Sequence, residues 1–141
     1  MRKETGLGVA IAMMLAAGTA QAQVIDLKGT WTGTSEAIFV GPATHHAKPG
    51  TAAASHQLGQ QPFTFVIEGQ EGRRFWGKVS SPGATERIIG SLSVDGKSIY
   101  LVDHDGMLDG TVVNADALDV CYRHVNRESA LVACLRVTRS K

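Results

Sequence analysis

The sequence has few aromatic residues, few prolines, two cysteines and almost no net charge. Aromatic residues make up 6% of the 141 residues, charged residues make up 19%, and the formal net charge is +1. A chain this close to neutral lacks the surplus of lysine and arginine that nucleic-acid binding requires, so we expect no nucleic-acid partner. The apolar fraction of 43% excludes an intrinsically disordered chain. The length fits one small domain.

One apolar run indicates a targeting segment. It follows a positively charged start, Arg2 and Lys3, and ends at Ala20-Gln21-Ala22, whose small residues match a signal-peptidase site. The run is too short for an anchor that spans about 30 Å of hydrocarbon. We therefore expect residues 1–22 to be a cleaved secretory signal peptide. The mature chain, residues 23–141, is expected to have no membrane span and to be periplasmic or secreted.

The mature sequence follows a strand pattern. Period-two alternation recurs about every ten residues between turn signals, and the chain has sixteen glycines against four prolines. With a first strand at Gly29–Val40 the pattern gives eight strands, and a sheet of this size removes its two edges by closing on itself. The prediction is an all-β fold, an eight-stranded antiparallel up-and-down meander closed into a small barrel. A flattened sandwich of the same meander is the alternative.

The turn signals also set the strand pairing. Gln70-Glu71-Gly72 fits a three-residue hairpin loop, and Asp95-Gly96 and Asp105-Gly106 fit two-residue turns. Counting outward from these turns and from Ser81–Ala84 gives an inner row in which large and small residues alternate. The expected pairs are Ile67 with Phe75, Gly77 with Ile88, Phe75 with Gly90, Leu92 with Ile99, and Leu101 with both Gly90 and Gly110.

The last hairpin contains both cysteines. If the turn is Asn126–Ser129, Cys121 lies opposite Cys134 at a non-hydrogen-bonded position, close enough for a disulfide. The same register places Asp119 opposite Arg136 on that face and leaves the other face almost wholly apolar. We therefore predict one disulfide, Cys121–Cys134, with a structural role.

The opening strand carries a family resemblance. Gly29-Thr30-Trp31 resembles the Gly-x-Trp start of the calycins, the lipocalin and avidin group of ligand-binding barrels. In that group the tryptophan seals the closed end and a basic residue of the last strand packs over it, which implies this pair of roles for Trp31 and Arg139. The ligand contacts of avidin are not recognisable, so no biotin site is implied. The whole chain is also similar to a family of small exported bacterial proteins.

The strand directions place a long connection, residues 41–61, at the end opposite Trp31. So long a connection is expected to be a lid, a binding loop or a disordered insertion. The function predicted is an exported binding module that holds a small apolar or amphipathic ligand at the barrel mouth. The alternative is a secreted scaffold or inhibitor that acts on another protein through its loops. The residues expected to line the mouth are Phe39, Phe63, Val79, Asp103, Leu108, Tyr122 and His124.

Catalytic and metal-binding motifs are sparse. The sequence contains no nucleophile elbow and no phosphate-binding loop, so we expect no enzyme activity and no cofactor. Glu36, Glu68 and Glu86 are expected to face outward, with Glu68 pairing with Arg74. The histidines match no established metal-ligand spacing, so metal binding is not predicted. The weak candidates are His45, His46, His56, His104 and His124.

An apolar row is expected on the outside of the barrel. The registers that send Phe75 and Leu101 inward place a row of apolar side chains across four neighbouring strands. Such a row around a tryptophan favours a protein contact, here a homodimer. The alternatives are that another segment of the chain covers the row or that a bulge turns Trp76 inward. The row consists of Val66, Trp76, Ile89, Tyr100 and Val102.

Overall fold

The computed structural model describes residues 24–41 and 56–141, and within them the chain forms eight strands and no helix. The expected signal peptide lies outside the described residues. No helix among the described residues is long and apolar enough to span a membrane. The strands are β1 (Gly29–Val40), β2 (Gln57–Glu71), β3 (Arg74–Ser80), β4 (Thr85–Leu92), β5 (Ser98–Val102), β6 (Met107–Asn114), β7 (Ala117–Val125) and β8 (Ala130–Arg139).

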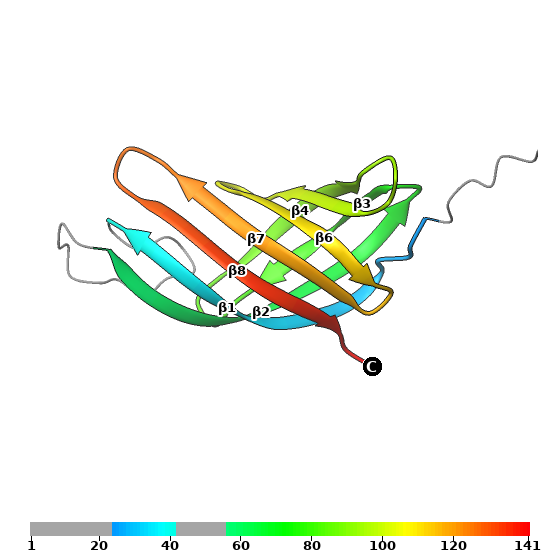
Figure 1. Ribbon diagram of the computed structural model, residues 1–141, viewed down its shortest axis with the longest axis horizontal. Helices are drawn as coiled ribbons and strands as arrows, with labels where there is room; N and C mark the ends of the chain where they lie inside the picture. The colour runs from blue at the N-terminus through cyan, green and yellow to red at the C-terminus, as the bar shows by residue number, and fades with distance from the viewer. Residues whose placement is uncertain (1–23, 42–55) are drawn as a thin grey trace, which may run out of the picture.

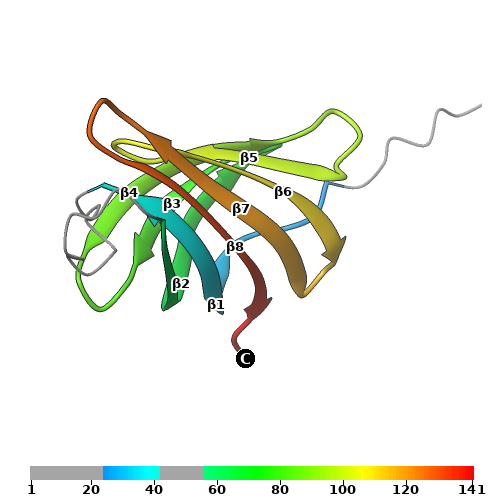
Figure 2. The ribbon, with the colours of Figure 1, turned by 60° about the vertical axis from the view of Figure 1, so that its left-hand side comes forward.

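The sheet closes on itself. Each strand pairs antiparallel with the next, and β8 returns to pair with β1 (Figures 1 and 2). Closure leaves neither the first nor the last strand with a free edge. The predicted eight-stranded closed meander is therefore confirmed, and the sandwich alternative is wrong.

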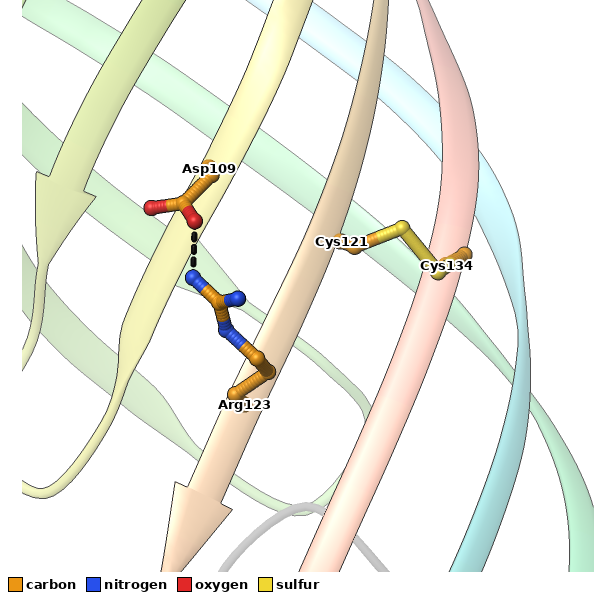
Figure 3. The surroundings of a disulfide bond; sticks show 4 residues. All are labelled: Asp109, Cys121, Arg123 and Cys134. Atoms are coloured by element: carbon orange, nitrogen blue, oxygen red, sulfur yellow. Dashed lines mark hydrogen bonds and ion pairs between the residues drawn. A yellow bond between two sulfur atoms is a disulfide. The ribbon is translucent and has the colours of Figure 1, made fainter.

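The last hairpin has the predicted register. Cys121 lies opposite Cys134 and forms a disulfide with a Cα–Cα distance of 4.1 Å, on the outer face of the barrel (Figure 3). Asp119 lies opposite Arg136, whose guanidinium donates two hydrogen bonds to the carboxylate at 2.6 and 2.7 Å. On the next strand pair, Arg123 forms an ion pair with Asp109 (Figure 3). This outer face is thus held by covalent and ionic links between strands.

Two predicted registers are wrong, each by two residues. Ile67 pairs with Gly77 rather than Phe75, because β2 continues through a bulge near Gly69 to Glu71 before turning. Leu101 pairs with Leu108 rather than Gly110. The predicted two-residue turn at Asp105-Gly106 is a four-residue loop, 103–106, closed by a hydrogen bond from the Asp103 amide to the Gly106 carbonyl. Because side chains alternate with period two, a shift of two residues keeps every one of them on its predicted face.

The other predicted pairs are confirmed. They are Gly77 with Ile88, Phe75 with Gly90, Gly90 with Leu101, and Leu92 with Ile99. The Phe75 ring lies where a side chain at position 90 would extend, so small and large residues share one layer of the interior. The interior is packed with apolar side chains around Trp31, Phe75 and Ile88, which are at most 2% exposed.

The two ends of the barrel differ. At one end, the right-hand side of Figure 1, β8 finishes near the turn between β6 and β7. At the other end, which we call the mouth, β1 finishes, β2 begins and β7 turns into β8. The long connection is shorter than predicted, because residues 57–61 belong to β2 and pair with β1 as far as Phe39. Residues 42–55 lie outside the described part.

Candidate ligand-binding site

The end opposite the mouth is sealed by Trp31 and Arg139. The Trp31 side chain is 1% exposed, and its indole N–H donates to the Leu27 carbonyl at 2.9 Å. The Arg139 guanidinium carbon lies 4.2 Å from the centroid of the Trp31 ring, and the same group donates to the carbonyls of Asp26, Lys28 and Ala115. The packing that the calycin resemblance implies for this pair is present, with Arg139 over the buried Trp31 ring.

At the mouth, some inward-facing side chains are partly exposed and others are buried. Phe39 and Phe63 are half-buried, whereas Phe65 and Leu101, deeper in the barrel wall, are each 7% exposed. Phe63 lies beside Phe65, with ring centroids 6.4 Å apart. Among the other predicted lining residues, Val79 and Leu108 are buried. Together these side chains give the mouth an apolar wall.

Beside this wall the mouth is polar, since Tyr122 is the cross-strand neighbour of Leu108, and Tyr122, Asp105 and His124 are hydrogen-bonded there. The Tyr122 hydroxyl donates to the Asp105 carboxylate at 3.0 Å. His124 is 6% exposed, and its Nδ1 lies 2.9 Å from the Asp105 carbonyl oxygen and 3.5 Å from the Asp105 carboxylate. Its Nε2 lies 3.1 Å from the Asn126 amide nitrogen and 3.3 Å from the Ser129 hydroxyl. Both ring nitrogens thus have partners within the barrel, so His124 links the β5–β6 loop to the β7–β8 turn.

Asp103 organises the turn between β5 and β6. Its carboxylate accepts hydrogen bonds from the backbone amides of Asp105 at 3.1 Å and Gly106 at 2.7 Å. Burial raises the pKa of this carboxyl above its ordinary value, and the neighbouring carboxylates of Glu86 and Asp105 act in the same direction. Burial, followed by the charges of Asp103 and Asp105, also raises the pKa of Tyr122. The carboxyl groups of Glu86, Asp103 and Asp105 are therefore close together in the polar part of the mouth.

Glu86 belongs to this site, although the sequence prediction placed it on the outside. It pairs with Val79, which is 5% exposed, and lies two residues before Ile88, which is 1% exposed, so it shares the inner face. The sequence could have shown this, because the alternation of side chains along β4 puts Glu86 on the same face as the buried Ile88. One ligand atom each from Glu86, His104 and Asp105 lies within 4.8 Å of the others, although His104 is itself exposed. Of the other weak metal candidates, His124 also lies beside Asp105, His56 is exposed just before β2, and His45 and His46 lie outside the described residues.

The predicted outer row lies on the outside of the barrel. Trp76 is 46% exposed and its ring covers Gly69 on the neighbouring strand, so it has not turned into the core. Ile89, Tyr100 and Val102 are exposed, whereas Val66 is only half-exposed. Glu68 does face outward, but its partner is Lys78 at 2.8 Å, and Arg74 pairs with Glu71.

Comparisons with known proteins found a similar solved structure but no matching family model or curated protein. No protein-family model and no curated protein matches the chain. A solved structure, the S-type phycobiliprotein lyase CPES from Guillardia theta, aligns over 82% of this chain and 89% of its own, with 12% identity and a TM-score of 0.32.

Proposed function

We propose that the protein is an exported binding module that holds a small amphipathic ligand at the barrel mouth. The observation that supports this most is the exposure pattern of inward-facing side chains, which are sealed at Trp31 and partly exposed at Phe39 and Phe63. Mouths of β-barrels are preferred sites for small ligands, and a mostly apolar wall with a few fixed polar groups is typical of them. Binding, rather than catalysis, accounts for these residues.

The charge of the mouth defines the ligand further. Its apolar wall suits a ring or an alkyl chain, whereas Glu86, Asp103 and Asp105 place carboxylates on the other part. Carboxylates stabilise a cationic or hydrogen-bond-donating head and repel an anionic one. The ligand class proposed is therefore an apolar body with a positively charged or donating head.

A matched pair of fluorescent probes tests this proposal. N-phenyl-1-naphthylamine is uncharged, and 1-anilinonaphthalene-8-sulfonate has the same ring system with an added sulfonate. We expect the uncharged probe to bind with enhanced, saturable fluorescence and the sulfonate to bind at least about tenfold more weakly, a difference of about 1.4 kcal/mol. Equal binding of both probes would contradict the proposal that the carboxylates of the mouth repel an anionic head. No binding of the uncharged probe would contradict a ligand site at the mouth.

Variants locate the probe. Phe39→Ala and Phe63→Ala shorten two side chains of the apolar wall and are expected to weaken binding of N-phenyl-1-naphthylamine. Ile89→Ala is the control, because Ile89 is 63% exposed on the outside of the barrel. Phe39 lies near the end of β1, so its substitution tests binding even if Phe63→Ala disturbs the fold. A loss of binding in Ile89→Ala alone would place the probe on the outer face.

The alternative function is a secreted scaffold that acts through its loops. Its main expected element falls in residues 42–55, outside the described part. Native mass spectrometry of the protein purified from its own source separates the two functions. An added small mass supports the binding module, whereas a complex with a second protein supports the scaffold.

A further inference from the structure

We propose that Glu86, His104 and Asp105 form a binding site for one divalent ion of the zinc class at the rim of the mouth. Glu86 and Asp105 also supply carboxylates to the proposed ligand site, but the proposal does not rest on the amphipathic ligand, because metal coordination by these side chains needs no ligand in the mouth. Glu86 comes from the start of β4, and His104 and Asp105 come from the turn between β5 and β6. Residues far apart in the sequence are thus brought together by the closed sheet.

The geometry fits one ion with a small adjustment. Three ligand atoms, one from each side chain, lie within 4.8 Å of one another. Ligand atoms that bind zinc at about 2.1 Å in a tetrahedral arrangement lie about 3.4 Å apart. His104 and Asp105 lie in the loop between β5 and β6 and Glu86 lies one residue from the start of β4, so small side-chain movements at a loop and a strand end can bring the three atoms to that spacing.

The donor set favours a transition metal over calcium or magnesium. One imidazole nitrogen and two carboxylate oxygens suit zinc and related divalent ions, whereas calcium and magnesium prefer oxygen ligands alone. Three protein ligands leave at least one coordination position for water, as in zinc sites that are open to solvent. The charges also balance, because the two positive charges of the ion offset the two negative charges of the Glu86 and Asp105 carboxylates.

The residues around this site hold Asp105 in place. The Tyr122 hydroxyl donates to one oxygen of the Asp105 carboxylate at 3.0 Å, and His124 Nδ1 lies 2.9 Å from the Asp105 carbonyl. Partners of this kind orient metal ligands, and their removal weakens metal affinity about 10- to 100-fold. Tyr122 is thus a positioning residue for the proposed site rather than a ligand.

Calorimetric titration of the chain without an affinity tag, after dialysis against a chelator, tests the site. We expect one Zn²⁺ per chain and weaker binding of Ca²⁺ and Mg²⁺. His104→Ala and Glu86→Gln each remove a ligand and are expected to weaken Zn²⁺ binding at least about tenfold, and Tyr122→Phe about tenfold. His56→Ala and Glu36→Gln are matched controls on exposed side chains and are expected to leave binding unchanged.

The contradicting results are equally specific. The site is wrong if Zn²⁺ does not bind, if His104→Ala and Glu86→Gln bind as tightly as the wild type, or if binding is lost only in His56→Ala. Circular dichroism confirms that each variant is folded before it is titrated. The visible spectrum of the Co²⁺ form gives a second measurement, since loss of the imidazole in His104→Ala changes it. Zn²⁺ binding that persists in Phe63→Ala separates this site from the proposed amphipathic-ligand site.

Discussion

At the level of single residues, Arg139 and Glu86 are charged side chains at the two ends of the barrel, Arg139 over Trp31 and Glu86 at the mouth. Arg139 was found through its resemblance to the basic residue of the calycin closed end, and it lies over Trp31. Glu86 was placed on the wrong face, although alternation from Ile88 assigns it to the interior. The alternation of the strands was enough to predict that Phe39 and Phe63 face inward, but Leu131, which lies between Phe39 and His124, was not among the predicted residues. The clustering of Glu86 with His104 and Asp105 depends on where two separate turns meet in space.

Arg139 is expected to stabilise the folded barrel. Arg139→Ala removes a charged donor from three backbone carbonyls and uncovers the Trp31 ring, so we expect the free energy of unfolding to fall by about 2–3 kcal/mol. Arg139→Lys retains the charge but lacks the planar set of donors, and is expected to lie between wild type and Arg139→Ala. Urea unfolding measures both, and a loss below about 0.5 kcal/mol in Arg139→Ala would contradict this role.

At the element scale, the accuracy of a predicted register depends on its turn. The hairpin of β7 and β8 was predicted correctly because Cys121 and Cys134 fix it independently of the turn. The pairing of β5 with β6 was wrong because Asp103 accepts hydrogen bonds from two amides of the loop, which widens the turn beyond the Asp-Gly pair. Side-chain capping of a turn competes with the backbone preferences used in the prediction.

The disulfide is expected to stabilise this last hairpin and the barrel with it. Replacing both residues, Cys121→Ser with Cys134→Ser, is expected to lower the free energy of unfolding by about 2–3 kcal/mol, because the reduced chain gains loop entropy when unfolded. Urea unfolding of the oxidised protein and the double variant measures the difference. Alkylation of two free thiols in denatured, unreduced, exported protein would show that the bond does not form.

Asp119 gives the hairpin a dependence on pH. The hydrogen bonds from Arg136 lower the pKa of Asp119, so the pair stabilises the folded state above the unfolded pKa of about 4 and loses this effect as the pH falls. We expect Asp119→Asn to have a slightly lower melting temperature than wild type at pH 7, with the difference vanishing in acid. The effect is small because the pair is exposed. A difference that grows as the pH falls would contradict the ion pair.

At the scale of the whole molecule, the period-two pattern predicted eight strands and favoured a closed barrel over a sandwich, and the pairing of β8 with β1 decides for the barrel. Errors of two residues in register leave this picture intact, because they move no side chain from one face to the other. The exposed surfaces of Trp76, Ile89 and Tyr100 give the prediction of a homodimer.

Sedimentation at micromolar concentration tests that dimer. We expect a dimer that Trp76→Arg converts to monomer, because a buried arginine without a partner is strongly unfavourable in an apolar contact. Val132→Arg is the control, since Val132 is 45% exposed on β8, outside the apolar row. A wild-type protein that sediments only as a monomer, or a dimer that Trp76→Arg leaves intact, would contradict the prediction.

The proposed function requires that the mouth, rather than any other surface, binds the ligand. An NMR titration of the ¹⁵N-labelled protein with N-phenyl-1-naphthylamine tests it most directly, because the two tryptophan indoles report from elsewhere in the barrel. Trp31 seals the closed end and Trp76 lies on the outside, so neither indole signal is expected to shift. The account predicts shifts in the amides around Phe39, Phe63 and Tyr122. Shifts centred on Trp76 and Ile89, or no shift at the mouth at saturation, would contradict it.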